Sequence, residues 1–113
     1  MKTTEVVQAL AKIALDKKAQ DVVILDLRPQ NTFTDFFIIC HGQSERQVQA
    51  IARAYKDHPL EEGLSIQSIE GEQGGRWILL DLSIVVINIF HQVEREFYAL
   101  EKLWGDATRI ALL

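Results

Sequence analysis

The chain has 113 residues, near the usual size of one domain, so we expect a single domain that spans residues 1–113. Hydrophobic residues make up 48% and charged residues 25%, which excludes disordered, collagenous and low-complexity proteins. The net charge of -4 argues against a surface that coats nucleic acid, and it suits a basic protein partner.

The first part of the chain predicts one helix followed by two strands. The inward face of the helix consists of apolar residues at helical spacing, namely Val6, Leu10, Ile13 and Ala14. The run 21–27 is short, apolar and rich in β-branched residues, and the run 36–40 is too short for a helix. Both runs therefore predict buried strands.

The second part begins with a capping box, in which Ser44 is the N-cap and Gln47 lies three residues further on. The helix that it opens is expected to bury Val48, Ile51, Ala52 and Tyr55. Three further strands are predicted over 65–69, 77–82 and 84–90. A last helix places Val93, Phe97, Leu100 and Trp104 at helical spacing and ends at Gly105. The order α-β-β-α-β-β-β-α predicts an α/β (α+β) fold.

Carboxylates do not form the pairs that a metal-dependent transferase needs. Asp26 and Asp81 each close a predicted strand, but neither has an acidic residue two positions further on. Glu70 and Glu72 do form such a pair, in a loop where solvated charges are the simpler interpretation. A metal-dependent nucleotidyltransferase that holds phosphate at Ser44 is the alternative function, and it requires this pair to fold inward. We therefore assign no catalytic residue and expect no metal or other cofactor.

The remaining chemistry-bearing residues favour structural roles. Cys40 and His41 are adjacent on a strand and point to opposite faces, so Cys40 is expected in the core rather than as a nucleophile. One cysteine allows no intramolecular disulfide, and the three histidines lack zinc-ligand spacing. The chain shows no signal peptide and no apolar stretch long enough for a membrane span. We expect a cytoplasmic protein without membrane contact.

Two tryptophans stand out as candidates for an interface. Trp77 follows Arg76 and a Gly-Gly loop at the start of a strand, and aromatic residues flanked by charge are good interface anchors. The residues alone leave open whether Trp77 is an anchor or part of the core, whereas Trp104 is in phase with Leu100 and is expected in the core. A direct RNA-binding domain is not favoured, because no strand carries an aromatic pair with basic neighbours.

Several stretches taken together carry a resemblance that no single motif would carry. They lie at 34–39, 42–48, 50–52, 70–71, 77–81 and 97–104. In this order and spacing they resemble the ribosomal silencing factor (RsfS or Iojap) family, over about residues 5 to 104. The resemblance implies a nucleotidyltransferase-like mixed sheet of five strands flanked by helices, without a working catalytic site.

The resemblance also implies function through binding. Family members dock on the large ribosomal subunit, against its fourteenth protein, and block association with the small subunit. They thereby repress translation when nutrients are short, while some members act as large-subunit assembly factors, which is a second alternative. A homodimer is possible, and no sequence-specific binding to nucleic acid is expected.

The residues that match family positions give a candidate partner-binding set. Trp77 and Leu82 match the strand and its end, and Asp81 between them is expected to pair with a basic group of the partner. Asp35 and Arg46 match further family positions. Their simpler interpretation is local: Asp35 closes a turn, and Arg46 lies in the first turn of a helix.

The chain departs from the family pattern after the strand that contains Asp81. Ser83 and Ile84 stand where a glycine-aspartate turn is usual, and Asn88 stands where the family has a histidine. These departures predict altered turn geometry, and they exclude an ionisable role for position 88.

Overall fold

The computed structural model describes residues 3–30, 33–58, 60 and 63–112. The first half of the chain contains α1 (Thr3–Asp16), β1 (Gln20–Asp26), the 3-10 helix η1 (Arg28–Gln30), β2 (Phe36–Gly42) and α2 (Glu45–Asp57). The second half contains β3 (Ser68–Glu70), β4 (Trp77–Asp81), β5 (Val85–His91), α3 (Gln92–Tyr98), α4 (Leu100–Leu103) and β6 (Thr108–Ile110). The fold is α+β, and no helix among the described residues is long and apolar enough to cross a membrane.

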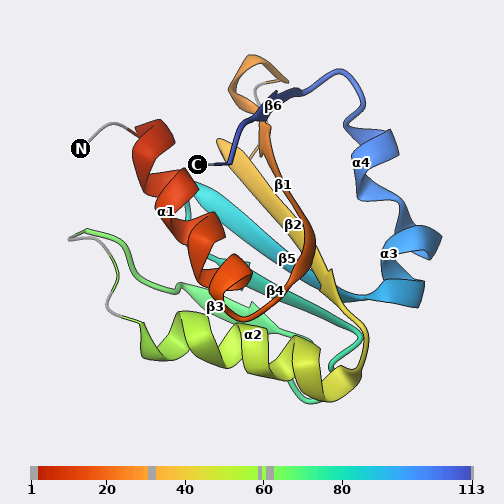
Figure 1. The fold of residues 1–113 in the computed structure, drawn as a ribbon. Helices are drawn as coiled ribbons and strands as arrows, with labels where there is room; N and C mark the ends of the chain where they lie inside the picture. Colours follow the sequence, from red (N-terminus) through yellow and green to blue (C-terminus); the bar gives the residue numbers. More distant parts are fainter. Residues whose placement is uncertain (1–2, 31–32, 59, 61–62, 113) are drawn as a thin grey trace.

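The strands of the described residues belong to one mixed six-stranded sheet in the order β3-β4-β5-β2-β1-β6 (Figure 1). The two central strands, β2 and β5, pair in parallel, and every other pair is antiparallel. Both central strands are buried along almost their whole length, as expected for strands covered on both faces. The mixed sheet agrees with the prediction.

The sheet has one strand more than predicted, and this is a correction to the five-stranded expectation. The additional strand, β6, follows the last helices and pairs antiparallel with β1, where Ile110 lies opposite Ile24. Its three residues are too few to show an alternating pattern, so sequence periodicity gave no signal for it. β3 is likewise shorter than predicted and begins at Ser68 rather than at Ser65.

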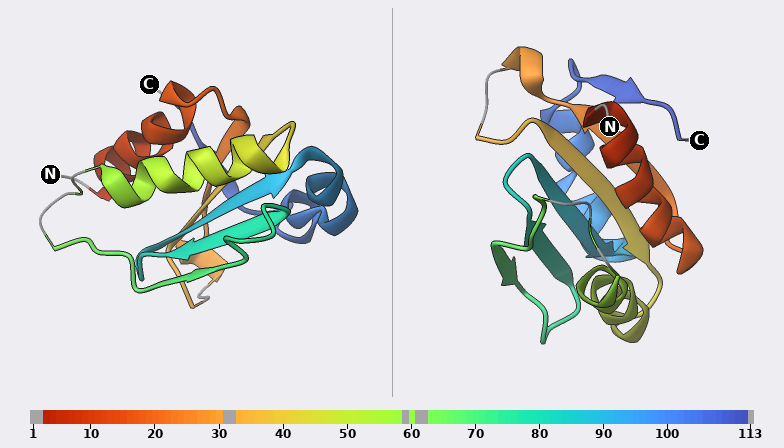
Figure 2. Two further views of the ribbon diagram at one scale, coloured as in Figure 1. Left: turned by 90° about the horizontal axis from the view of Figure 1, so that it is seen from below. Right: turned by 90° about the vertical axis from the view of Figure 1, so that its left-hand side faces the viewer.

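The helices α1 and α2 cover one face of the sheet, and α3 and α4 lie against the other (Figures 1 and 2). The face under α1 and α2 holds the main core, in which predicted inward residues such as Leu10 and Ile51 are buried. Ser44 caps α2 as predicted, since its side chain accepts a hydrogen bond of 3.0 Å from the backbone N–H of Gln47. Tyr55 is also buried there, and its hydroxyl donates to the carbonyl of Leu10 at 2.6 Å.

The last predicted helix is broken in two, and its predicted inward stripe is wrong at its first half. Ala99 adopts a left-handed conformation (φ 48°, ψ 48°) that ends α3 and precedes α4. Val93 and Phe97 are 57% and 77% exposed, so they do not enter the core. Leu100 and Trp104 do pack against the sheet, but they remain partly exposed. The buried residue of α3 is instead Arg95.

Candidate interaction site

The strand β4 presents two different faces. Ile78 and Leu80 are buried, whereas Trp77, Leu79 and Asp81 alternate with them and are only half-buried. These half-buried residues lie on the side of the sheet that carries α3 and α4, where the helices leave part of the strand uncovered. The structure therefore brings two of the candidate residues, Trp77 and Asp81, to the same face of one strand.

Trp77 is held in a defined position by aromatic and polar contacts. Its ring stacks on Phe90 with centroids 4.9 Å apart, and the ring of Tyr98 packs against it at a tilt with centroids 4.7 Å apart. Its indole N–H donates to Oδ1 of Asn88 at 3.1 Å. Such a ring is ordered before any partner arrives, which lowers the entropy cost of binding.

Asn88 is a residue whose role the sequence analysis missed. It is buried in β5 and is the hydrogen-bond acceptor that orients Trp77. The antiparallel register pairs Trp77 with Phe90, which places Asn88 diagonally opposite on the same face. A correct register between the two predicted strands would have revealed this pair.

The helix α3 adds exposed apolar side chains beside Trp77. Phe97 is 77% exposed and Tyr98 is 48% exposed, and their rings contact each other edge-on with centroids 5.2 Å apart. We call Trp77, Leu79, Phe97 and Tyr98 the aromatic face. Contiguous exposed apolar residues of this kind mark interaction surfaces in soluble proteins.

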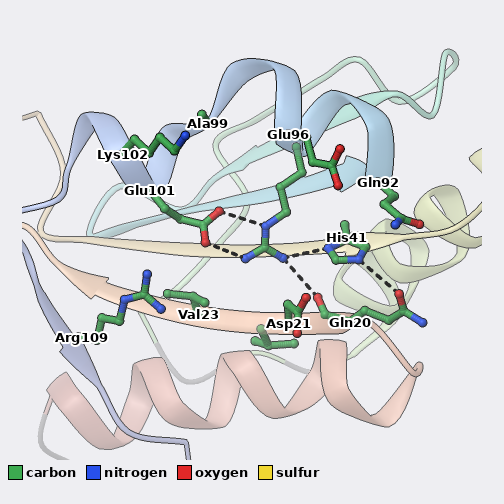
Figure 3. A pocket seen from close by; sticks show the side chains of 12 residues that line it. Gln20, Asp21, Val23, His41, Gln92, Glu96, Ala99, Glu101, Lys102 and Arg109 are labelled. Carbon is green, nitrogen blue, oxygen red and sulfur yellow. Dashed lines mark hydrogen bonds and ion pairs between the residues drawn. The ribbon is translucent and has the colours of Figure 1, made fainter.

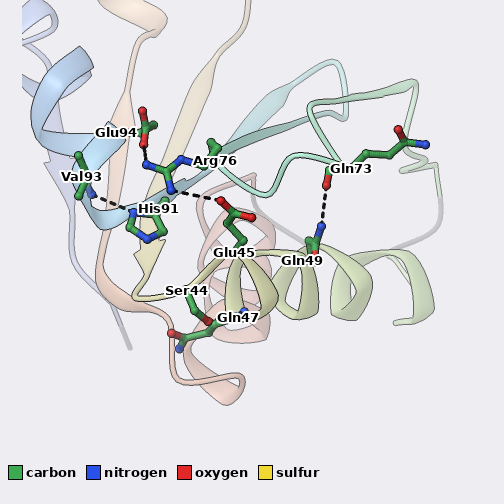
Figure 4. Close-up of polar contacts among 9 residues, drawn as sticks. All are labelled: Ser44, Glu45, Gln47, Gln49, Gln73, Arg76, His91, Val93 and Glu94. Carbon is green, nitrogen blue, oxygen red and sulfur yellow. Dashed lines mark hydrogen bonds and ion pairs between the residues drawn. The ribbon is translucent and has the colours of Figure 1, made fainter.

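The loop before Trp77 is fixed by two glycines and by the ion pairs of Arg76, which Figure 4 shows. Gly71 (φ 77°) lies so close to Trp77 that a Cβ would overlap the carbonyl oxygen of Trp77, and a Cβ at Gly75 (φ 65°) would lie 2.8 Å from the carbonyl oxygen of Glu45. Arg76 then pairs with Glu45 of α2 and with Glu94 of α3. The start of β4 is thereby tied to helices on both faces of the sheet.

The other end of β4 forms a tight turn in which Asp81 has a structural contact. Its Oδ1 accepts a hydrogen bond of 2.8 Å from the backbone N–H of Ser83, which adopts a left-handed conformation (φ 75°). Thr34 donates to the carbonyl of Ser83 at 3.1 Å and fastens the turn to the start of β2. Leu82 is 2% exposed and points into the core under α1 and α2. The structure therefore separates Leu82 from Trp77 and Asp81.

The two remaining candidate residues are exposed and lie apart. Asp35 precedes β2 at the same end of the sheet as Asp81, and its backbone N–H donates to Ile84 at 3.1 Å. The turn that we expected at Asp35 is thus built by its backbone. Arg46 lies in the first turn of α2, on the helix that covers the opposite face.

A cleft of about 680 Å³ lies between α3 and α4 on one side and β1 and β2 on the other (Figure 3). Arg95 is one of its lining residues and is 8% exposed. Arg95 donates two hydrogen bonds to Glu101, of 2.9 and 3.1 Å, and one to Nδ1 of His41 at 2.9 Å. We call Arg95, Glu101, His41 and Gln20 the Arg95 cluster.

Electrostatics in this cluster favour charged Glu101 and neutral His41. The hydrogen bonds from Arg95 lower the pKa of Glu101 below its ordinary value. Burial, followed by the nearby charge of Arg95, lowers the pKa of His41. A neutral His41 whose Nδ1 accepts from Arg95 carries its proton on Nε2, which lies 3.1 Å from Oε1 of Gln20.

The residues weighed for enzymatic chemistry have structural positions. Cys40 is fully buried on the opposite side of β2 from His41, as predicted, and burial raises the pKa of its thiol to about 12. Glu72 pairs with Lys56 at the surface and does not fold inward. Among the described residues, no group of three or more His, Cys, Asp and Glu side chains could hold a metal ion.

Comparison with known proteins adds a family to this geometry. Residues 1–112 match the family model described as "Ribosomal silencing factor during starvation". The chain is 46% identical to ribosomal silencing factor RsfS of Halalkalibacterium halodurans, over 99% of this chain and 96% of that protein. It is 45% identical to the protein of that name from Bacillus subtilis, over 95% and 91% of the two chains. A crystal structure of a Bacillus halodurans protein superposes with a TM-score of 0.81 at 44% identity, covering 96% of this chain and 98% of the other.

Proposed function

Since this chain belongs to the ribosomal silencing factor (RsfS) family, we propose that it docks on the large ribosomal subunit through the aromatic face. The docked protein occupies the surface that the small subunit must contact, and translation is repressed because the subunits do not join. Members of this family are non-enzymatic ribosome-binding factors, which confirms that the chain is not an enzyme. The nucleotidyltransferase alternative is therefore set aside. We place this activity in the cytoplasm.

The aromatic face is the observation that carries this proposal. Trp77 is ordered by Phe90, Tyr98 and Asn88, yet it is only half-buried. Phe97, which contacts Tyr98, is strongly exposed. Interface hot spots are commonly aromatic side chains that fill a pocket of the partner after water is excluded. A ring that is already fixed needs little further ordering on binding, so most of its apolar contact contributes to affinity.

The charge around the aromatic face favours a basic partner, for which we propose the fourteenth protein of the large subunit. Asp81 lies on the same strand face as Trp77 but at the other end of β4, and Asp35 lies exposed at the end of the sheet where Asp81 lies. These carboxylates and the net charge of -4 favour association with a basic surface. Arg46 lies on α2, so we propose it as a separate peripheral contact.

Leu82 supports this surface from behind in our proposal. Its side chain is 2% exposed and packs under the turn that positions Asp81 and Ser83. A match to the family at this position is then explained by the shape of the turn, which determines where Asp81 points.

The direct test is sedimentation of purified ribosomal subunits with the protein added. The protein is expected to migrate with the large subunit and to reduce the amount of joined ribosomes. Trp77→Ala is expected to weaken binding by about 2 kcal/mol or more, as hot-spot residues do. Phe97→Ala should also weaken binding, and it should leave the fold nearly unchanged because Phe97 is so exposed.

The matched control is Leu15→Ala, which truncates a partly exposed apolar residue on α1, on the opposite face of the sheet. This variant is expected to bind the large subunit like the parent protein. Equal binding by Trp77→Ala, Phe97→Ala and the parent protein would refute the aromatic face as the docking surface. Failure of the parent protein to bind the subunit would refute the proposed function itself.

A further inference from the structure

The exposed aromatic residues of α3 lie on a segment with little apolar anchoring. Residues 92–103 form two short helices joined at the left-handed Ala99, and α4 has no side-chain cap at its N-terminus. Val93, Phe97 and Leu103 point into solvent, so these large apolar side chains do not hold the segment on the sheet. Its apolar anchoring comes from Leu100 and Tyr98, which pack against the residues below them. Polar contacts are a second source of order for the segment.

Arg95 of α3 makes hydrogen bonds to α4 and to the two strands beneath the segment. Its Nε and Nη2 donate to the two oxygens of Glu101, on the far side of the Ala99 break. Its Nη1 donates to Nδ1 of His41 on β2 and to the carbonyl of Gln20 on β1. One planar guanidinium thus joins α3, α4 and two strands, a geometry that the point charge of lysine does not reproduce.

We propose that Arg95 is a positioning residue for docking, which fixes α3 and α4 on the sheet so that Phe97 and Tyr98 lie beside Trp77. This inference rests on the proposed function, since it treats the aromatic face as the docking surface. Tyr98 contacts Trp77 three residues along the same helix from Arg95, so loss of the guanidinium contacts moves the ring that flanks Trp77.

The cluster also makes docking sensitive to the protonation of His41. The charged groups that face His41 are Arg95 and Glu96 from α3, Glu101 from α4 and Asp21 from β1. Neutral His41 accepts a hydrogen bond from Arg95, whereas protonated His41 has no acceptor there and places a second positive charge against the guanidinium. Docking is therefore expected to weaken as the pH falls.

The pH window follows from the direction of the shift. The pKa of His41 is lowered from the ordinary value of 6.5, mainly by burial. As the pH falls below 6.5, an unfolded or detached His41 binds a proton before the clustered one does, so acid favours the detached state. The change is expected below pH 6.5 and is complete once the clustered His41 is protonated.

The test compares Arg95→Lys with Arg109→Lys, the same substitution at an exposed arginine of the same cleft. Large-subunit affinity is measured by sedimentation, and the fluorescence of Trp77 is followed in the isolated protein in a Trp104→Phe background. Arg95→Lys is expected to reduce affinity roughly tenfold, equivalent to about 1.4 kcal/mol, and to change the Trp77 fluorescence. Arg109→Lys is expected to change neither. Thermal unfolding of each variant gives the folded fraction, by which the affinities are corrected.

A second variant, His41→Asn, keeps a hydrogen-bond acceptor near the position of Nδ1 but does not titrate. The parent protein should lose affinity and change its Trp77 fluorescence between pH 7.5 and 5.5, whereas His41→Asn should respond less. Parent-like affinity and fluorescence in Arg95→Lys, or an equal pH response in His41→Asn and the parent protein, would overturn the inference. If Trp77→Ala and Phe97→Ala both leave binding unchanged, the proposed docking surface fails, and the fluorescence of the isolated variants then decides whether Arg95 positions the segment.

Discussion

The two faces of the sheet are built on different principles. Under α1 and α2, 22 buried residues of the described chain form one apolar cluster, which holds the chain together. Under α3 and α4 the corresponding cluster has six, and the same face carries the buried polar residues His41, Asn88 and Arg95. Apolar burial on the first face stabilises the folded chain. On the second face, polar contacts replace part of the apolar packing, and they orient exposed aromatic rings. Their difference separates residues needed to fold from residues needed to bind.

The largest expected effect compares two neighbours on β4 that carry the same side chain. Leu80 is fully buried under α1 and α2, so Leu80→Ala is expected to reduce the free energy of unfolding by about 2–5 kcal/mol. Leu79 is half-buried on the aromatic face, so Leu79→Ala should cost less stability and reduce subunit affinity instead. Denaturant unfolding and sedimentation are measured on both variants. Leu80→Ala is expected to show the larger loss of stability, and Leu79→Ala the larger loss of subunit affinity.

An equal loss of stability in both variants would break the comparison between the faces. A loss of affinity in Leu80→Ala that persists after correction for its folded fraction would do the same. Either result would mean that the side of β4 does not decide the role of a residue.

The next effect concerns the polar support of Trp77. Asn88→Ala leaves the indole N–H without its acceptor and is expected to cost about 1–3 kcal/mol of stability. It should also weaken subunit binding, because the ring is less well oriented. A double-mutant cycle with Trp77→Phe, which removes the donor, isolates the pair, and additive effects would contradict the coupling.

The smallest effect is a gain of stability at the turn after β4. Ser83 adopts φ 75°, a left-handed conformation that is strained for a residue with a Cβ but not for glycine. Ser83→Gly is therefore expected to be neutral or to stabilise the protein by up to about 1 kcal/mol. The hydrogen bond from the backbone N–H of residue 83 to Oδ1 of Asp81 is retained in this variant. Thermal unfolding measures the change, and a clear fall in the melting temperature would contradict the expectation.

The sequence predicted the apolar face of the molecule better than the polar one. Strands β2 and β5 and the cap at Ser44 follow from local patterns, which need no knowledge of distant partners. The Arg95 cluster joins residues from opposite ends of the chain, so no window of sequence contains it.

The last predicted helix shows most clearly what local sequence patterns fail to predict. Spacing placed Val93 and Phe97 in the core, but the burial of Arg95 and the left-handed Ala99 turn them to solvent. Trp77 was undecided between core and anchor, and it proves half-buried, with its polar atom bound to Asn88. Its contacts with Asn88 and Phe90 on the neighbouring strand hold this orientation.

The position of β6 has a consequence for the order in which the sheet assembles. Ile110 pairs with Ile24, and Gln8 of α1 donates to the carbonyl of Ala111, so β6 pairs with segments that are distant in the sequence. Such non-local pairings form slowly, because a long loop must close before the contacts form. The segment that carries Phe97 and Tyr98 lies between β5 and β6, so it is fastened at both ends only once β6 has paired. The docking surface is therefore expected to become ordered late in folding.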